Sequence, residues 1–328
     1  MRAFVTRQLP EEALMIARSA GELDVWPGDG PPSHAEIAAR TADCDGLLCL
    51  LTDRIDEDLL IRTPKLRVVS QMAVGYDNID VEACTRRGIA VGNTPGVLTE
   101  TTADLAFGLL LMTARRLGEA ERWLHGGLWK TWSPMELTGQ DVHHATLGIV
   151  GMGRIGYEMA RRATGFQMRL LYHSRSRNEA VERDFGATWV ALNALLAQSD
   201  FVSLHTPLTA ETRHLIGESE LAKMRPNAIL INTARGAVLD QAALVSALRN
   251  RRIAGAGLDV FEAEPLPPND PLLALENVVL LPHIGSASIA TRTKMAVLAA
   301  ENLAAGLRGL ALPHPINPEV AARPSRSQ

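Results

Sequence analysis

Cysteine, aromatic residues and net charge are all scarce in this chain of 328 residues. The three cysteines, Cys44, Cys49 and Cys84, are an odd number without Cys-x-x-Cys spacing, which excludes a disulfide framework and favours a reducing compartment such as the cytoplasm. The net charge of −4 comes from interspersed acidic and basic residues. No basic patch therefore points to a nucleic acid or to an anionic membrane as a partner.

Long hydrophobic runs are also absent. The longest, Leu105–Ala114, is much shorter than a membrane span and is better interpreted as part of a buried helix. The first residues contain no continuous apolar stretch of the kind that a signal peptide needs. The pair His143–His144 has no carboxylate or cysteine at metal-ligand spacing. The sequence therefore predicts neither a membrane partner nor a metal site.

What the chain does contain is an alternation of short apolar strands with helical segments, which is typical of parallel α/β sheets. The strands predicted in the first part are 2–6, 46–51, 66–72 and 89–93. The same rhythm restarts at Thr146, with strands predicted at 146–150, 168–173, 201–205, 228–232, 255–260 and 278–282. A helix over Ile289–Leu307 follows, and the tail from Pro313 is expected to be frayed.

Between these two parts lie a strongly apolar helix, predicted over Thr99–Leu117, and an irregular arm over about 118–144. The arm carries Trp129 and Trp132 beside glycines and a proline. Two interpretations stay open: exposed tryptophans that make a subunit contact, or tryptophans that fill the chain's own core.

The segment Gly151–Gly156, with sequence GMGRIG, directly follows a strand and opens a helix. In that context Gly151 permits a tight turn, Gly153 lets a pyrophosphate approach the backbone, and Gly156 lets helix and strand pack closely. The anion would lie on the free N–H groups of the helix N-terminus. The pattern predicts a dinucleotide site, although a turn that serves packing alone would look the same.

The next strand ends in Ser174-Arg175-Ser176-Arg177, where an NAD site usually has an acidic residue. Two guanidiniums and two hydroxyls can instead bind a 2′-phosphate, so we expect NADP(H) to be preferred and NAD(H) to be possible. The alternative is a solvated basic turn.

Three polar residues follow strands of the second part: Arg235, Glu264 and His283. The carboxyl ends of parallel strands meet at one edge, where ligands bind. Reduction of a 2-keto acid needs a cation for the carboxylate and carbonyl, which suits Arg235, and a proton donor, which suits His283. Glu264 could hold the imidazole and favour its charged form. Each residue alone could equally be structural.

Four motifs in order, together with several longer stretches, resemble the D-isomer-specific 2-hydroxyacid dehydrogenases, and most closely their glyoxylate/hydroxypyruvate reductases. The motifs are GMGRIG, NTARG, GLDVFEAEP and PHIGSA. The closer likeness lies in CLLTDRID, VGYDNID, GNTPGVLTETTADLAFGLLL and GGLWKTW. The resemblance covers nearly the whole chain.

The resemblance implies two Rossmann-like, doubly wound domains, of which one is discontinuous in sequence. The substrate domain would comprise 1–98 plus 286–328, and the dinucleotide domain 99–285 with a dimerisation arm at about 118–144. It also implies a homodimer built through the dinucleotide domain.

The resemblance assigns catalysis to Arg235, Glu264 and His283. The implied substrate-binding residues are Leu51, Val74, Gly75, Arg235 and His283, with Trp132 reaching the partner's pocket. The implied cofactor-binding residues are Thr102, Gly151, Gly153, Arg154, Ile155, Gly156, Ser174, Arg175, Ser176, His205, Thr206, Pro207, Thr233, Ala234, Arg235, Asp259, His283 and Gly285.

The expected activity is NADPH-dependent reduction of glyoxylate or hydroxypyruvate to glycolate or D-glycerate. Phosphite is an unlikely substrate because phosphite dehydrogenases of this family carry lysine at the position of Val74. Two alternatives stay open. The substrate could be 2-ketogluconate or a bulkier keto acid, or the chain could be a cofactor-sensing binding protein like the co-repressors that share the fold and the catalytic trio.

Overall fold

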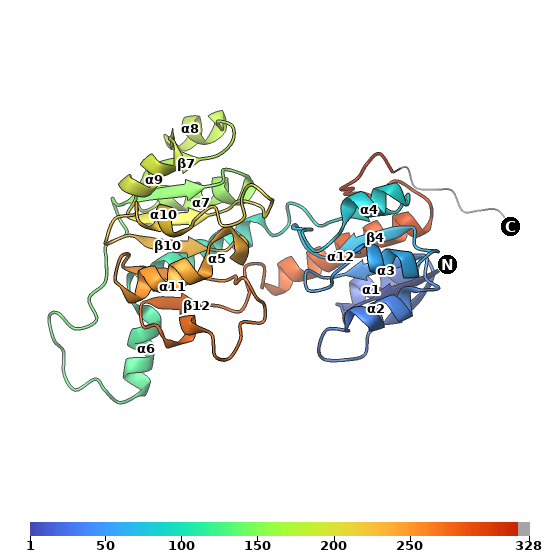
Figure 1. Ribbon diagram of the computed structural model, residues 1–328, viewed down its shortest axis with the longest axis horizontal. Helices are drawn as coiled ribbons and strands as arrows, with labels where there is room; N and C mark the ends of the chain where they lie inside the picture. The colour runs from blue at the N-terminus through green and yellow to red at the C-terminus, as the bar shows by residue number, and fades with distance from the viewer. Residues whose placement is uncertain (321–328) are drawn as a thin grey trace. The chain divides into compact units, whose positions relative to one another are not determined.

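The computed structural model describes residues 1–320 and divides into two compact units (Figure 1). Unit 1 comprises Met1–Leu98 and the segment from Ala287 onward, and unit 2 comprises Thr99–Ser286. The assignment of these units as substrate and dinucleotide domains stays a prediction. Residues 321–328, the end of the expected tail, lie outside the described residues.

Unit 1 is built on a parallel sheet of five strands in the order β2-β1-β3-β4-β5. Its elements are β1 (Arg2–Val5), α1 (Glu11–Arg18), β2 (Glu22–Val25), α2 (His34–Thr41), β3 (Gly46–Cys49), α3 (Glu57–Arg62), β4 (Val68–Gln71), α4 (Val81–Arg86), β5 (Ala90–Gly92) and α12 (Ile289–Leu307).

Helices cover both faces of this sheet because successive strand residues point to opposite sides. Phe4 packs with buried residues of α2, α3 and α4, whereas its neighbours Ala3 and Val5 pack with those of α1 and α12. Helix α12, which follows unit 2 in the sequence, is therefore part of the core of unit 1.

Unit 2 is built on a parallel sheet of seven strands in the order β12-β11-β10-β9-β6-β7-β8. Its elements are α5 (Thr99–Ala114), α6 (Leu117–His125), β6 (Thr146–Val150), α7 (Arg154–Thr164), β7 (Arg169–His173), α8 (Glu179–Phe185), β8 (Thr188–Trp189), α9 (Leu192–Gln198), β9 (Phe201–Leu204), α10 (Glu218–Leu221), β10 (Ile229–Asn232), η1 (Gly236–Val238), α11 (Gln241–Arg249), β11 (Gly255–Leu258), η2 (Pro271–Ala274) and β12 (Val278–Leu280).

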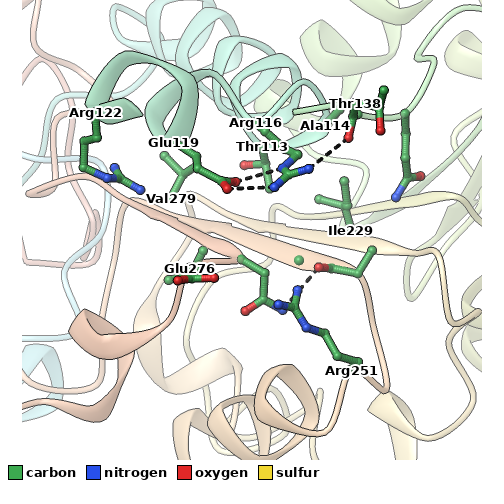
Figure 2. A pocket seen from close by; sticks show the side chains of 16 residues that line it. Thr113, Ala114, Arg116, Glu119, Arg122, Thr138, Ile229, Arg251, Glu276 and Val279 are labelled. Carbon is green, nitrogen blue, oxygen red and sulfur yellow. Dashed lines mark hydrogen bonds and ion pairs between the residues drawn. The ribbon is translucent and has the colours of Figure 1, made fainter. Parts of the chain in front are cut away.

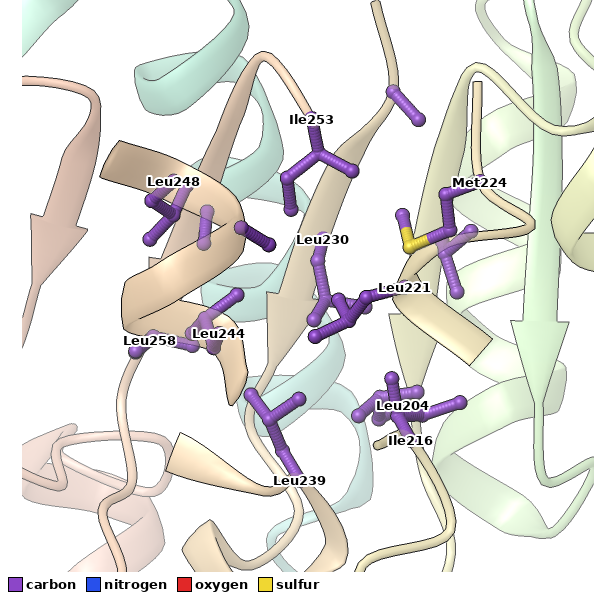
Figure 3. Packing of buried hydrophobic residues seen from close by; sticks show 14 of the residues in the cluster. Leu204, Ile216, Leu221, Met224, Leu230, Leu239, Leu244, Leu248, Ile253 and Leu258 are labelled. Carbon is purple, nitrogen blue, oxygen red and sulfur yellow. The ribbon is translucent and has the colours of Figure 1, made fainter. Parts of the chain in front are cut away.

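The seven-stranded sheet also has two apolar faces. Leu230 of β10 packs with Leu244 and Leu248 of α11, in a cluster to which α9 and α10 contribute (Figure 3). Its neighbours on β10, Ile229 and Ile231, point to the other face and pack with α5 and α7. Both sheets are thus doubly wound, which confirms the predicted fold class.

Several predictions about local structure were wrong. The helix from Thr99 ends at Ala114, and the arm begins with the separate helix α6 before it becomes irregular. The short strands β2 and β8 were missed, since neither is a buried apolar run. Among residues 1–320, no helix has the length and apolarity needed to cross a membrane.

The beginning of the tail is not frayed. Pro315 forms an antiparallel bridge with Gly92, and the backbone N–H of Ile316 donates to the carbonyl of Val91 at 2.7 Å. The buried carboxamide of Asn317 accepts from the N–H of Val91 at 2.7 Å. The composition of the segment hid these backbone contacts, which attach it to β5.

Strands β6 and β9 are neighbours in the sheet, and the order of the strands changes direction between them. The residues that follow their carboxyl ends, Gly151 and His205, lie against each other. A Cβ added at Gly151 would come within 2.7 Å of the backbone of His205. The ring Nε2 of His205 lies 2.8 Å from the hydroxyl of Ser203. Burial of the imidazole lowers the pKa of His205 to about 4, although the residue keeps some exposed surface.

This depressed pKa predicts a loss of stability in acid. The unfolded chain takes up a proton on His205 near pH 6.5, whereas the folded chain does so only near pH 4, so stability falls as the pH decreases between these values. We expect His205→Gln to reduce the loss in unfolding free energy between about pH 7 and about pH 4.5 by about 2 kcal/mol. Denaturant unfolding at both pH values measures this loss of unfolding free energy. The substitution His125→Gln, at an exposed histidine, controls for the change of side chain. An unchanged pH dependence would contradict the assignment.

Candidate active site

The glycine segment forms a cradle between β6 and α7. Gly151 has a φ of +95°, which favours glycine, and its N–H donates to the carbonyl of His173 at 2.8 Å. A Cβ at Gly156 would lie 2.2 Å from the carbonyl oxygen of Gly151, whereas a Cβ at Gly153 would meet nothing within 4 Å. Gly156 therefore serves close packing, and Gly153 faces open space.

The N-terminus of α7 can bind an anion. Gly153 is its N-cap and offers no side chain to the free N–H groups, and the first turn carries no acidic residue. Asn178 donates from Nδ2 to the carbonyl of Met152 at 3.2 Å. In a trans peptide the next N–H points the opposite way, so this bond turns the N–H of Gly153 away from Asn178. Arg154 and Ile155 lie in the same first turn, and the cradle fits the pyrophosphate of a dinucleotide.

In the turn after β7, one of the two arginines already has an acidic partner. Arg177 makes a two-pronged ion pair with Glu182, at 2.7 and 3.0 Å, and Glu182 also accepts from the hydroxyl of Tyr172 at 2.6 Å. The hydroxyl of Ser174 donates to the carbonyl of Ser176. Arg177 therefore already has an acidic partner at the start of α8, and the expectation that it binds a 2′-phosphate beside Arg175 stays a prediction.

Two buried hydroxyls at this edge have no hydrogen-bond partner among the described residues. They belong to Thr206, after β9, and Thr233, after β10. A buried hydroxyl without a partner is costly in a folded protein. Both residues were expected to contact the cofactor, and their unpartnered hydroxyls fit a polar ligand here. Pro207 and Ala234 follow them in the chain, at the same strand ends.

Arg235 stands three residues beyond β10, in a turn closed by Asn232. The carboxamide of Asn232 donates to the carbonyl of Arg235 at 2.9 Å and accepts from the N–H of Ala234 at 3.0 Å. Next to it, a Cβ at Gly236 would collide with the backbone of Phe261, at 1.8 Å. Glycine at 236 therefore lets the arginine loop lie against the loop that carries Glu264.

His283 and Glu264 form the closest polar pair of the site. The ring Nδ1 lies 2.6 Å from Oε2 of the carboxylate, and Oε1 accepts from the N–H of Phe261 at 2.9 Å. Burial would raise the pKa of Glu264, but the hydrogen bond and charge of His283, the Phe261 amide and the charge of Arg235 outweigh it and lower this pKa. The ionised carboxylate can only accept, so Nδ1 of His283 carries the proton. The ring Nε2 has no hydrogen-bond partner among the residues of unit 2.

Asp259 holds the backbone around His283. Its carboxylate accepts from the N–H groups of Ile284 and Gly285, each at 2.7 Å, and its carbonyl accepts from the N–H of His283 at 2.9 Å. His283 has a φ of +54°, in the left-handed region. Such a conformation costs about 1–3 kcal/mol and persists where its surroundings enforce it. Burial raises the pKa of Asp259 more than its hydrogen bonds lower it.

Thr102 of α5, which was also expected to contact the cofactor, lies beside the segment that follows His283. Thr102 is buried, and its side chain would be 3.4 Å from a Cβ added at Gly285. The structure therefore brings together Arg235, Glu264 and His283. Asp259 and Thr102 lie against the backbone that follows His283.

The expected substrate loops lie in unit 1, at the carboxyl ends of β3 and β4. Leu51 belongs to a turn whose Asp53 is buried and accepts from the N–H of Leu50 at 2.8 Å and from the hydroxyl of Thr6. Val74 and Gly75 follow β4 and are half-buried. Trp132 lies in the arm of unit 2 and is 77% exposed, and Trp129 is 59% exposed. The interpretation that these tryptophans fill the chain's own core was wrong.

A cavity of about 450 Å³ lies elsewhere in unit 2 (Figure 2). Its lining includes Ile229, Gly255 and Val278, the first residues of β10, β11 and β12. It therefore lies at the amino edge of the sheet, opposite the edge that carries the catalytic trio. The Arg116–Glu119 ion pair, at 2.7 Å, forms part of its wall.

One group in the described part of the chain has metal-ligand spacing that the sequence did not reveal. Ligand atoms of His34, Asp56 and Asp58 lie within 4.8 Å of one another. Asp56, however, already pairs with His34 at 3.0 Å and with Arg54 at 2.9 Å, and it caps α3 through the N–H of Leu59. Local structure explains the group.

Sequence reasoning missed the side chains that hold the site's backbone, such as Asn178 and Asn232. Asn178 carries a detectable signal, because asparagine before a helix is a common N-cap and it caps α8. Its second bond, to Met152, depends on the fold and has no signature in the sequence.

Comparison with known proteins agrees with this geometry. Residues 107–285 match the sequence model described as D-isomer specific 2-hydroxyacid dehydrogenase, NAD binding domain. A glyoxylate reductase of Korarchaeum cryptofilum is 57% identical over 320 residues, which cover 97% of this chain and 96% of that protein. A glyoxylate reductase of Thermococcus litoralis is 50% identical over 323 residues, which cover 97% of each.

Solved structures agree as well. A protein of Thermus thermophilus superposes with a TM-score of 0.90 at 48% identity, over 96% of this chain and all of that one. An NADPH-dependent glyoxylate/hydroxypyruvate reductase of Sinorhizobium meliloti, solved with NADP and malonate, has a TM-score of 0.86 at 36% identity over 99% of each chain. The chain belongs to the D-isomer-specific 2-hydroxyacid dehydrogenases and is an NAD(P)-dependent dehydrogenase.

Proposed function

We propose that the protein reduces glyoxylate and hydroxypyruvate to glycolate and D-glycerate, with NADPH as the preferred reductant. The observation that carries this proposal is the His283–Glu264 pair, because it leaves the ring Nε2 available to give a proton to a substrate oxygen. The names of the relatives, glyoxylate reductases from several archaea, support the substrate class.

Each residue of the site has a separate role in the proposed reaction. Arg235 binds the substrate's carboxylate and carbonyl through its fork of N–H donors, and the backbone of Val74 and Gly75 holds the carboxylate. The bound reduced nicotinamide supplies the hydride. His283 delivers a proton from Nε2 to the carbonyl oxygen, while Glu264 fixes the ring through Nδ1.

The cofactor is held by the cradle Gly151–Gly156 and by the strand ends. Gly153 and the first turn of α7 bind the pyrophosphate, and Ser174, Arg175 and Ser176 bind the 2′-phosphate. The hydroxyls of Thr206 and Thr233 gain partners when the ligand binds. The carboxylate oxygens of Asp259 accept from two backbone N–H groups and have further lone pairs. These lone pairs accept a hydrogen bond from the nicotinamide amide.

We also propose that the enzyme works in the cytoplasm, since all three cysteines are buried and free in the structure.

The substrate prediction is tested by initial rates of NADPH oxidation with glyoxylate, hydroxypyruvate, 2-ketogluconate and phenylpyruvate. We expect the two small keto acids to give the highest kcat/KM. His283→Ala should lower kcat by about 10²–10⁴-fold and weaken the binding of NADPH far less, because the proton donor acts in the chemical step.

A higher kcat/KM for a bulky keto acid would overturn the substrate assignment. Binding of NADPH without turnover of any keto acid would favour a cofactor-sensing protein instead. Near-normal turnover by His283→Ala would remove this residue from the mechanism.

The cofactor preference is tested at the turn after β7. We expect Arg175→Ala to raise the KM for NADPH about tenfold or more and to change the KM for NADH little, because only NADPH carries the 2′-phosphate. Arg177→Ala is the matched control, since this guanidinium is paired with Glu182. Equal effects on the two cofactors, or a larger effect of Arg177→Ala on NADPH, would contradict the assignment.

We further propose a homodimer formed through the arm at about 118–144, whose part after α6 extends from unit 2 as a long loop (Figure 1). Leu128, Trp129, Trp132 and Met135 are each more than half exposed there. Such a group of exposed apolar residues is typical of an interface, and Trp132 would reach the substrate pocket of the partner subunit.

Sedimentation equilibrium tests the dimer. The protein should have twice the mass of the chain, and the double substitution Trp129→Ala, Trp132→Ala should shift it toward the monomer. Met15→Ala is a control, because Met15 is as exposed as Trp129, at 59%. A wild-type monomer would refute the dimer.

A further inference from the structure

Two neighbouring backbone N–H groups of unit 1 lack an acceptor. They belong to Val74 and Gly75, in the loop after β4, and neither donates a hydrogen bond to a described residue of unit 1. Both residues are half-buried. Half-buried N–H groups can be satisfied by water or by a ligand, so this adjacent pair is available to an anion.

The carbonyls of the same peptide units are both held from one side. The carbonyl of Ala73 accepts from the N–H of Thr94 at 3.0 Å, and the carbonyl of Val74 accepts from Nδ2 of Asn93 at 2.8 Å. In a trans peptide, the C=O of one residue and the N–H of the next point in opposite directions. The two bonds therefore turn the N–H groups of Val74 and Gly75 away from the segment 93–94, toward a common side.

Asn93 is itself fixed by the core of unit 1. Its carbonyl accepts from Nδ2 of Asn302 at 2.8 Å, and its N–H donates to the carbonyl of His314 at 3.2 Å. Asn302 is fully buried in α12, and its Oδ1 accepts from the N–H of His314 at 3.0 Å. The side chain of Asn93 thus connects a rigid part of the core to the loop of Val74.

We propose that Asn93 is a positioning residue for the reaction: its Nδ2–H fixes the Val74–Gly75 peptide so that the N–H of Gly75, beside that of Val74, meets the carboxylate of the 2-keto acid. Asn93 acts through the backbone and does not touch the substrate. The inference rests on the proposed function, since it takes a 2-keto acid as the ligand of this loop.

The variant Asn93→Ala removes the side-chain donor and leaves the bond from Thr94 in place. In the presence of NADPH, we expect the dissociation constant of oxamate, an unreactive analogue of a 2-keto acid, to rise about tenfold to a hundredfold, the range for a lost hydrogen bond to a charged group. The KM for glyoxylate should rise by a similar factor and kcat should fall less. Binding of NADPH alone should not change, because the nucleotide does not use this loop.

Asn277→Ala is the matched control. Asn277 is also half-buried and donates from Nδ2 to backbone carbonyls, those of Leu248 at 3.3 Å and Ala254 at 3.2 Å, but at the amino edge of the other sheet. It should change the melting temperature about as much as Asn93→Ala and leave the affinity for oxamate unchanged. If both variants weaken oxamate equally, Asn93 has only a structural role.

A measurement on the wild-type chain keeps the inference testable even if Asn93→Ala does not fold. Amide hydrogen exchange should show the N–H groups of Val74 and Gly75 to be exchangeable in the NADPH complex and protected when oxamate is added. Oxamate binding without protection of this loop overturns the inference and leaves the proposed function intact. Failure of the wild-type protein to bind oxamate or to reduce keto acids refutes the proposed function itself.

Discussion

The hydrogen bond between His283 and Glu264 is the interaction on which the proposed chemistry depends. A carboxylate that stays ionised can only accept, so it places the proton on Nδ1 and leaves Nε2 to exchange a proton with the substrate. The backbone of His283 is left-handed, which costs energy, and three hydrogen bonds to Asp259 hold this segment. Two carboxylates therefore cooperate: Glu264 fixes the ring, and Asp259 fixes the chain that carries it.

The same physical device recurs in both units. A side-chain carboxamide donates to a backbone carbonyl, and the rigid peptide plane turns the next N–H toward a ligand. Asn178 does this at Met152 in the glycine cradle, and Asn93 does it at Val74. In each case the N–H groups at the carboxyl end of a strand are already oriented, so the proposed binding of an anion would not have to order them.

Much of the fold could be predicted because buried parallel strands are continuous apolar runs. The helix Ile289–Leu307 was predicted with its observed bounds, and the strand Thr146–Val150 likewise. The polar strand β2 gave no such signal, and neither did the attachment of Pro315 and Ile316 to β5, which depends on backbone contacts between distant segments. For the site, motifs that follow strands located Arg235, Glu264 and His283. The sequence could not show that Arg177 is committed to Glu182, or that Asn93 supports the loop of Val74, because these pairings exist only after folding.

A crystal structure of the complex with NADP⁺ and oxamate tests the central claim most directly. The account predicts Nε2 of His283 within hydrogen-bonding distance of the oxamate carbonyl oxygen, Nδ1 still on Glu264, and the oxamate carboxylate on the N–H groups of Val74 and Gly75. Oxamate bound away from His283, or a His283 ring turned so that Nε2 faces Glu264, would contradict it.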